Sequence, residues 1–374
     1  MRASMENRFR KPLTMSVCIA THERAGLLAG TLDGLSRQTR PPDEVIISDS
    51  SSAPESGDVV AAFAARHSSL RVRYVPCSRK ALPWQRWWAF QHSSGEVVLF
   101  LDDDVTLAPP ALDALERAYA SLPAALGEPV AGIGFWITYE DGTRLPRDTS
   151  SLRERWLGIS RLRSGCLSSG GLAVSLAGID EDEPVEVDVL WGGAMSFRRE
   201  ALTAMPLHNL VSLYEAGIGR GEDSVLSFYA RRVGKLFVLN ESLAVHPYEP
   251  PEVATPYARD GWRLGLTHTF GRAHTMRWMA SDWSAYKTDW FRFVTYDLFR
   301  GLGAVLVRPW SGKTWLRLAG ACYGIGLSLV EWKRIPSSAR SDVEPPEVSR
   351  ASSEDQRSPR ERTVRAGKRG RHRK

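Results

Sequence analysis

The chain lacks three features that would place it in common protein classes. Its four cysteines are scattered and form no Cys-x-x-Cys pair, so the sequence predicts neither a disulfide framework nor a cysteine metal site. The first fifteen residues contain no apolar stretch of signal-peptide length. No internal repeat is visible. We therefore expect a globular protein in a reducing, cytoplasmic location.

The chain also has little net charge outside its C-terminal end. Its formal net charge is +6, but residues 336–374 contain 11 Lys and Arg against 6 Asp and Glu. The rest of the chain has 38 against 37, so the charge balance is no evidence for a nucleic-acid-binding core. Residues 336–374 almost lack large apolar side chains, and we expect a disordered basic tail. Attraction to anionic lipid headgroups is one use for it, and a functionless extension remains open.

An uninterrupted membrane-spanning run is missing as well. Trp315–Trp332 approaches the required length but contains Arg317 and Glu331. A spanning helix needs ~20 predominantly apolar residues, so we expect a packed or interfacial amphipathic helix instead. This segment belongs to an aromatic helical extension, residues 251–335, which we expect to associate with a membrane surface.

Short apolar runs alternate with segments of helical periodicity in the first part of the chain. The runs that read as buried strands are Met15–Ala20, Glu44–Ser48, Val72–Val75 and Val97–Leu101. This alternation predicts an α/β fold with a parallel-core, nucleotide-binding sheet flanked by helices. The expected units are a lead (1–14) and a catalytic domain (15–250), which divides into a donor and metal half (15–125) and an acceptor half (126–250).

Three consecutive aspartates, Asp102, Asp103 and Asp104, close the strand Val97–Leu101. Packing like charges together raises their pKa values and costs stability unless a cation offsets the repulsion. Mg²⁺ and Mn²⁺ prefer such oxygen ligands, and open α/β sheets bind ligands at the carboxyl ends of their strands. The pattern predicts a divalent metal site, although an acidic turn that caps the next helix remains open.

Several segments, in order, resemble the motifs of family 2 nucleotide-sugar glycosyltransferases, which have the GT-A fold. The segments are Ser16–Arg24 (SVCIATHER), Glu44–Ser52 (EVIISDSSS), Leu82–Glu96 (LPWQRWWAFQHSSGE), Asp102–Asp104, Trp191–Glu200 (WGGAMSFRRE), Gly221–Ser224 (GEDS) and His246. Each motif is weak singly, but their common order is a strong signal. The resemblance covers about residues 16–247.

The resemblance implies a role for particular residues. Those expected to bind the donor are Thr21, Arg24, Asp49, Arg86 and Asp103. Those expected to contact the acceptor are Trp191, Gly192 and Gly193. Asp223 is the expected catalytic base, with Glu222 orienting nearby groups. The expected metal ligands are Asp102, Asp104 and His246, the two aspartates because alternate residues of an extended segment face the same way.

Three of these residues also have simpler interpretations. Asp223 would serve as a helix N-cap, Asp49 as an Asx-turn residue at a strand end, and His246 as a histidine at the edge of the core. These alternatives remain open at the level of sequence.

The resemblance implies a metal-dependent, inverting transfer of a sugar from a nucleoside diphosphate donor, with Mn²⁺ or Mg²⁺ as cofactor. UDP is favoured over dTDP and GDP only by family frequency. The expected acceptor is a glycan, a lipid-linked glycan or a polysaccharide precursor, at the inner face of the plasma membrane. No specific nucleic-acid partner is expected.

One alternative enzyme fits the aspartates. Val98–Leu107 (VLFLDDDVTL) also matches the nucleophile motif of haloacid-dehalogenase-like phosphatases. Asp102 would then attack phosphate and Asp104 would act as acid and base. That motif usually opens its domain, whereas two βα units precede it here. A nucleotide-binding protein without turnover is a further alternative.

Overall fold

The structure is a computed structural model that describes residues 12–142, 151–174, 184–203, 210–247 and 260–331. The predicted tail and most of the predicted lead lie outside these residues. The strands are β1 (Met15–Thr21), β2 (Glu44–Asp49), β3 (Val72–Pro76), β4 (Val97–Asp102), β5 (Thr106–Leu107), β6 (Val130–Tyr139), β7 (Val185–Val187), β8 (Ala194–Arg198) and β9 (Lys235–His246). The helices that flank the sheet are α2 (Ala25–Ser36), α3 (Glu55–Arg66), α4 (Leu82–Gln91), α5 (Ala111–Leu126), α7 (Arg199–Leu202), α8 (Val211–Glu215) and α9 (Glu222–Ala230).

The described strands form one mixed sheet in the order β3-β2-β1-β4-β8-β6-β9-β5, and β7 also pairs with β9. The strands β3, β2, β1 and β4 are parallel, as predicted. β8 is antiparallel to both β4 and β6. The predicted α/β class with a parallel core is confirmed. The antiparallel β8 connects this core to the second half of the sheet.

Alternating side chains of the central strands pack against helices on both faces of the sheet. Val17 and Ile19 of β1 pack in one apolar cluster with residues of α2, α3 and α5. Cys18 of β1 and Phe100 of β4 face the opposite way, into a cluster with residues of α4 and α9. Because helices cover both faces of the sheet, these strands are apolar almost throughout. This composition is why they could be recognised as strands in the sequence.

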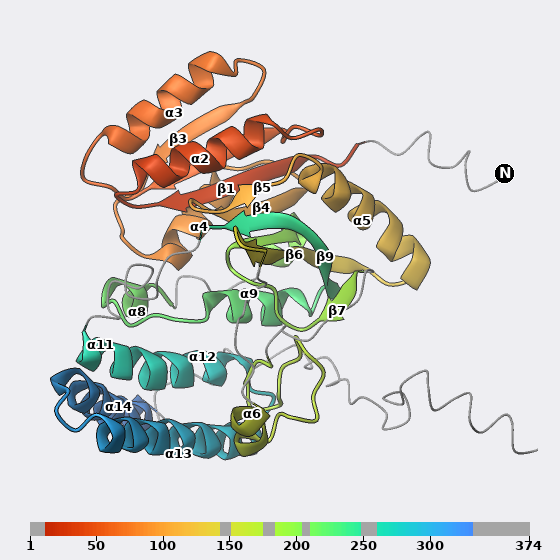
Figure 1. The fold of residues 1–374 in the computed structure, drawn as a ribbon. Helices are drawn as coiled ribbons and strands as arrows, with labels where there is room; N and C mark the ends of the chain where they lie inside the picture. The colour runs from red at the N-terminus through yellow and green to blue at the C-terminus, as the bar shows by residue number, and fades with distance from the viewer. Residues whose placement is uncertain (1–11, 143–150, 175–183, 204–209, 248–259, 332–374) are drawn as a thin grey trace, which may run out of the picture.

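A helical layer lies on the α9 side of the sheet (Figure 1). Its members are α6 (Ser151–Leu157), α11 (Gly261–Leu266), a π-helical turn (Thr267–Gly271), α12 (Arg272–Met279), α13 (Trp283–Val307) and α14 (Gly312–Glu331). Leu157, Met276, Trp290 and Phe293 belong to a separate apolar core of this layer. The predicted helical C-terminal region is thus confirmed. Among the described helices, none is both long enough and apolar enough to cross a membrane.

Three segments after β6 have less regular structure than the first four strands. The segment 185–197 is two short strands, β7 and β8, with the glycine pair in the connection between them. β9 extends as far as His246, since it pairs along its length with β6, β7 and β5. The segment 140–182 lacks clear periodicity but contains α6, a short helix that tertiary packing against α13 stabilises.

Candidate active site

A cavity of about 190 Å³ lies at the carboxyl ends of β1 and β4. Four predicted residues line it, namely Thr21, Arg24, Asp102 and Asp103. Gln85 of α4 lines it too, and its side-chain amide donates to the carbonyl oxygen of Thr21 at 2.7 Å. The fold therefore brings the first strand loop and the aspartates together where open α/β sheets bind their ligands.

The three aspartates do not alternate as residues of an extended strand. β4 ends at Asp102, and Asp103 and Asp104 form a turn. Arg24 binds both turn residues, through Nη1 to Asp103 Oδ1 at 2.9 Å and Nη2 to Asp104 Oδ2 at 2.5 Å. Asp102 instead accepts from Arg86. The geometric reason given for pairing Asp102 with Asp104 is therefore wrong, because the chain turns one residue earlier than the pattern implied.

Asp103 is buried in this turn and accepts a hydrogen bond from Thr21 Oγ1 at 2.6 Å. Burial raises the pKa of Asp103 to about 7, against the opposing effects of Arg24 and Thr21. The carboxyl group thus joins the first strand loop to the aspartate turn. Its predicted contact with the donor stays a prediction.

Arg86 connects the aspartates to the second half of the sheet. Its guanidinium donates to Asp102 Oδ1 and Glu222 Oε1, both at 2.8 Å, and to the carbonyl oxygen of Gly192 at 2.7 Å. The residue is only 2% exposed. A planar guanidinium has several donors in fixed directions, so one side chain can hold three acceptors in place. In the structure Arg86 connects the two halves of the sheet. Its predicted role in donor binding stays a prediction.

Glu222 and Asp223 occupy the first turn of α9. Gly221 precedes them with φ +82°, a left-handed conformation that glycine adopts without strain. The helix begins at Glu222, so the alternative that Asp223 is an N-cap is wrong. Burial, followed by the charge of Glu222, raises the pKa of Asp223 to about 6. A carboxylate tuned toward neutrality in this way suits a general base.

Glu222 is held more tightly than its neighbour. It is buried, and besides Arg86 it binds the hydroxyl of Tyr214, which donates to Glu222 Oε2. Burial and the charge of Glu222 raise the pKa of this tyrosine well above its ordinary value. Tyr214 was not identified from the sequence, because nothing in its local pattern distinguishes it from a core aromatic. The arrangement fits Glu222 as a group that fixes the position of the turn.

The glycine pair lies between the aspartates and the α9 turn. The backbone N–H of Asp102 donates to the carbonyl oxygen of Gly193 at 2.9 Å. A Cβ at Gly192 would lie 3.3 Å from Arg86 Nη2, and one at Gly193 would lie 2.6 Å from Ile137 Cδ1. A side chain at Gly193 would therefore force Ile137 to shift, and one at Gly192 would press on the guanidinium of Arg86. The glycines therefore permit a close approach, whereas their predicted contact with the acceptor stays a prediction.

The predicted metal ligands meet in part. Within the described residues, no group of three or more His, Cys, Asp and Glu side chains is close enough together to hold a metal ion. Asp104 Oδ1 is buried, accepts no hydrogen bond from the described residues and lies 3.4 Å from His246 Nε2. A carboxylate oxygen and the nitrogen of a neutral imidazole are both ligands of divalent metal ions, so the imidazole would have to lose its proton to bind one. Asp104 and His246 thus fit the predicted ion, whereas Asp102 offers it only the oxygen that Arg86 leaves open.

The two charges influence each other strongly. Burial alone would raise the pKa of Asp104, but His246 and Arg24 hold it below its ordinary value. Burial alone would lower the pKa of His246, but Asp104 raises it to about 9. The imidazole of His246 also interacts with the carbonyl oxygen of Pro247 at 2.6 Å from Nδ1. The pair therefore fixes the orientation of both side chains.

Asp49 does not line the donor-side cavity. Its Oδ1 accepts from the backbone N–H of Ser51 at 2.8 Å, which is an Asx turn, and its Oδ2 accepts from the hydroxyl of Tyr74 at 2.7 Å. The simpler interpretation of this residue is therefore present in the structure. The predicted contact with the nucleobase stays a prediction.

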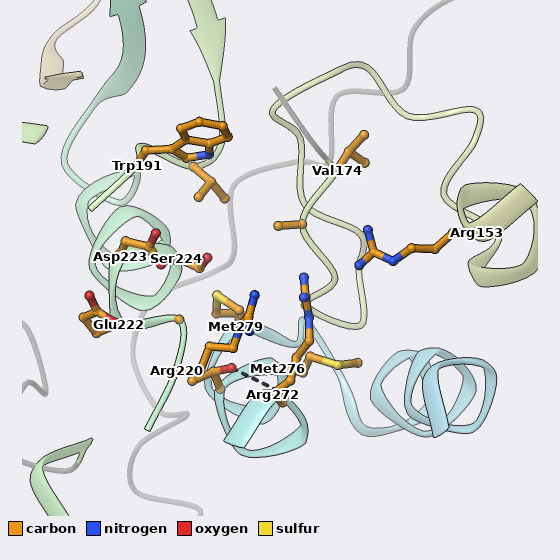
Figure 2. Close-up of a pocket in the computed structure, with 15 residues that line it drawn as sticks. Arg153, Val174, Trp191, Arg220, Glu222, Asp223, Ser224, Arg272, Met276 and Met279 are labelled. Carbon is orange, nitrogen blue, oxygen red and sulfur yellow. Dashed lines mark hydrogen bonds between the residues drawn. The ribbon is translucent and has the colours of Figure 1, made fainter. Parts of the chain in front are cut away.

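A second cavity, of about 330 Å³, opens on the other side of the α9 turn (Figure 2). Trp191, Glu222, Asp223 and Ser224 line one part of it. The helix α12 provides the opposite wall, with Met276 and Met279 among its residues. Asp223 thus borders a cavity large enough for a sugar, and Trp191 lies at its edge, where an indole face can stack on a sugar ring.

Three arginines of this second cavity were missed from the sequence. Arg153, Arg220 and Arg272 line it, from α6, the loop before α9, and α12. Arg220 lies two residues before Glu222, directly next to the Gly221–Ser224 motif. This position is a signal that could have identified it from the sequence. Arg153 and Arg272 lie in segments without a motif, and only the tertiary structure brings them to the site.

Comparison with known proteins agrees with the motifs. Residues 16–171 match the family model described as glycosyl transferase family 2. This range contains the first strand loop, Arg86 and all three aspartates. No curated protein matches the chain.

Three solved structures have a similar course of the chain. One is the mannosyltransferase PcManGT from Pyrobaculum calidifontis in complex with GDP-Man and Mn²⁺, with 16% identity, 89% of this chain and 94% of that chain covered, and a TM-score of 0.46. Another is S. aureus TarS 1–349, with 13% identity, 86% and 82% covered, and a TM-score of 0.49. A third is GalNAc-T7 with UDP, GalNAc and Mn²⁺, with 17% identity, 70% and 50% covered, and a TM-score of 0.43.

At similarities this low, no role in this chain is taken from those structures. The family match covers the donor half of the predicted catalytic domain, and the geometry joins that half to the α9 turn through Arg86. The phosphatase alternative assigns no role to this connection through Arg86. Residues 16–171 are therefore a glycosyl transferase family 2 domain, the part of the chain that carries the aspartates and Arg86.

Proposed function

We propose that the protein transfers a sugar from a nucleoside diphosphate donor to an acceptor hydroxyl with inversion, using a divalent metal ion. One observation carries the proposal. Arg86 joins Asp102 of the donor-side cavity to Glu222, the neighbour of Asp223, so that a carboxylate with a raised pKa faces each cavity. A donor at the strand ends and an acceptor on the far side of Asp223 would then meet at the α9 turn.

The chemistry assigned to Asp223 is that of a general base. Its carboxylate accepts the proton of the acceptor hydroxyl as the acceptor oxygen bonds to the anomeric carbon. The bond from that carbon to the diphosphate breaks in the same displacement, which inverts the configuration. Glu222, held by Arg86 and Tyr214, keeps the turn in place. Trp191 is assigned to the acceptor sugar because it lines the same cavity as Asp223.

The residues proposed to hold Mn²⁺ or Mg²⁺ are Asp104, His246 and Asp102. When bound, such an ion stabilises the negative charge that develops on the leaving diphosphate. Thr21, Arg24 and Asp103 line or adjoin the cavity proposed for the donor. UDP-sugars are the first donors to test, followed by dTDP- and GDP-sugars. The acceptor is a glycan, a lipid-linked glycan or a polysaccharide precursor.

A thermal-shift screen of UDP-, dTDP- and GDP-sugars with and without Mn²⁺ tests the donor site. We expect a stabilisation by one nucleotide class that requires the ion and is lost in Asp104→Ala. Asp113→Ala, at a partly exposed aspartate of α5 outside both cavities, is the matched control and keeps the shift. Stabilisation by no donor, together with hydrolysis of a generic phosphate ester, would overturn the proposal in favour of the phosphatase.

We also propose that the corner between α13 and α14 contacts an anionic membrane surface on the cytoplasmic side. Leu306, Val307 and Trp310 are 79%, 71% and 81% exposed, which is unusual for three large apolar side chains so close in the chain. Arg308 and Lys313 are exposed beside them. Apolar residues flanked by cations are typical of interfacial membrane contacts.

Flotation with vesicles tests this surface. We expect the protein to float with vesicles that contain anionic phosphatidylglycerol and less with pure phosphatidylcholine. The double variant Leu306→Ser/Trp310→Ser should lose flotation without unfolding, because both side chains are exposed. Leu126→Ser, at an exposed leucine of α5, is the matched control. Unchanged flotation of the double variant would remove this corner as the membrane contact.

A further inference from the structure

The cavity beside Asp223 carries a concentration of positive charge. Arg153, Arg220 and Arg272 all line it. Figure 2 shows the guanidinium groups of Arg153 and Arg272 directed into the same space, opposite Asp223 and Ser224. Three cations around a cavity of about 330 Å³ repel one another, and this repulsion lowers stability unless an anion is present.

Two of these cations, Arg220 and Arg272, lack a direct ion pair with the described carboxylates. Burial, with the charges of Arg220 and Arg153, lowers the pKa of Arg272 to about 9. The nearby acid Asp297 is engaged by Arg300 at 2.7 Å. Asp223 is the acid of the cavity wall that offsets Arg272, and the proposed reaction requires its carboxylate as a base.

Arg220 is held in position by a histidine of the helical layer. Its Nη1 lies 3.3 Å from Nε2 of His268, in the π-helical turn before α12. Burial and the surrounding arginines, Arg220 first among them, lower the pKa of His268 to about 2. The imidazole is therefore neutral and accepts the hydrogen bond from Arg220. A guanidinium fixed by a neutral acceptor keeps its full positive charge for a ligand.

The rest of the wall is suited to a ligand with both anionic and less polar parts. Thr275 and Ser224 offer hydroxyl groups, while Met276, Met279 and Trp191 provide apolar surface. Planar guanidinium groups bind phosphate oxygens in a bidentate manner, and several of them together match a group with more than one negative charge.

We infer that this cavity binds a phosphate group of the acceptor, through Arg220 and Arg272 with Arg153 at the opposite side. The inference rests on the proposed function, since it takes Asp223 as the base and this cavity as the acceptor site. The phosphate group serves as an anchor that brings the acceptor hydroxyl to Asp223. Its source is either a lipid-linked phosphate or a phosphate within a glycan, which share this chemistry.

Calorimetric titration of the full chain with inorganic phosphate and with sn-glycerol 3-phosphate is the direct test. We expect saturable binding of both, without donor and without metal. Arg220→Gln and Arg272→Gln should each weaken it about tenfold to a hundredfold, as expected for loss of one charged hydrogen-bonding group. Arg272→Lys should keep part of the affinity, and Arg66→Gln, an exposed arginine of α3, should keep all of it.

Donor binding separates this inference from the proposed function. The Mn²⁺-dependent thermal shift by the nucleotide sugar should be unchanged in Arg220→Gln. If that shift is lost together with phosphate binding, the arginines hold the donor diphosphate and the inference is overturned while the glycosyltransferase assignment stands. Equal phosphate binding by wild type and both glutamine variants would also overturn it.

Transfer assays with two synthetic acceptors distinguish the sources. A short polyprenyl phosphate-linked sugar and a sugar phosphodiester without lipid are compared with their uncharged analogues. We expect a KM at least about tenfold lower for one phosphorylated acceptor than for its analogue, and Arg220→Gln should remove the difference. The preferred acceptor identifies the source. Equal KM values for charged and uncharged acceptors would refute the anchor.

Discussion

Replacing Arg86 with glutamine tests whether one buried guanidinium joins the two halves of the catalytic domain. Removing one partner of a buried ion pair destabilises a protein by about 3–5 kcal/mol, because the remaining charge is left unpaired. The side chain of Glu222 is 9% exposed, so its pairing with Arg86 counts almost fully, whereas that of Asp102 is 33% exposed and is partly screened. We therefore expect the lower end, a loss of about 3 kcal/mol in the free energy of unfolding.

Thermal unfolding followed by circular dichroism measures this loss. A change of 1 kcal/mol lowers Tm by about 2–4 °C in a domain of this size, so we expect a decrease of about 6–12 °C. The Tm of Arg86→Lys should lie between those of wild type and Arg86→Gln. An ammonium group keeps the positive charge but cannot bind Asp102 and Glu222 at once as the guanidinium does. Adding Glu222→Gln to Arg86→Gln should recover part of the loss, since it removes the unpaired charge. A Tm within about 2 °C of wild type for Arg86→Gln would refute this reasoning.

Further predictions concern the base and the helical layer. Asp223→Asn should lower the transfer rate about 10²–10⁴-fold while the thermal shift by the donor is retained, because the amide cannot accept the proton. Since the pKa of Asp223 is raised to about 6 and its carboxylate is the active form, the transfer rate should be level above that pH and fall as the pH drops through it, which a kcat profile measures. Gly265→Val should lower Tm, because a Cβ there would overlap the carbonyl oxygen of Arg317 where α11 packs on α14, at a cost of about 1–3 kcal/mol. Gly303→Ala, with open space around its Cβ position inside α13, is the control and should not lower Tm, since alanine is the better helix former.

The first four strands of the sheet could be predicted from sequence because their information is local. Most of these strands are short apolar runs that are buried on both faces, and the polar residues of the site directly follow a strand. β1 with Thr21 and β4 with Asp102 are examples. The order of the strands in the sheet then brings these ends together. The turn at Asp103 and Asp104 could not be predicted, since three identical residues carry no signal for the point at which a strand stops.

The second cavity depends on packing between distant segments. Arg153, Trp191, Asp223 and Arg272 come from four different elements. Of these, only Trp191 and Asp223 lie in a recognisable motif. The close contact of α11 with α14 relies on Gly261 and Gly265, whose spacing has no meaning until the partner helix is known. Residues of the site that lie outside a motif therefore could not be predicted from the sequence.

The position of Arg86 also explains why the two halves need each other. A guanidinium that is 2% exposed requires acceptors from the protein, and its acceptors come from β4, from the glycine pair and from α9. The donor half alone would leave Arg86 with Asp102 and two unpaired N–H groups, at the cost of a buried charge that is incompletely solvated. The acceptor half alone would leave Glu222, which is also buried, with Tyr214 as its remaining partner. Folding of either half thus favours docking of the other, and in the docked arrangement Asp223 lines the second cavity beside the Glu222 that Arg86 binds.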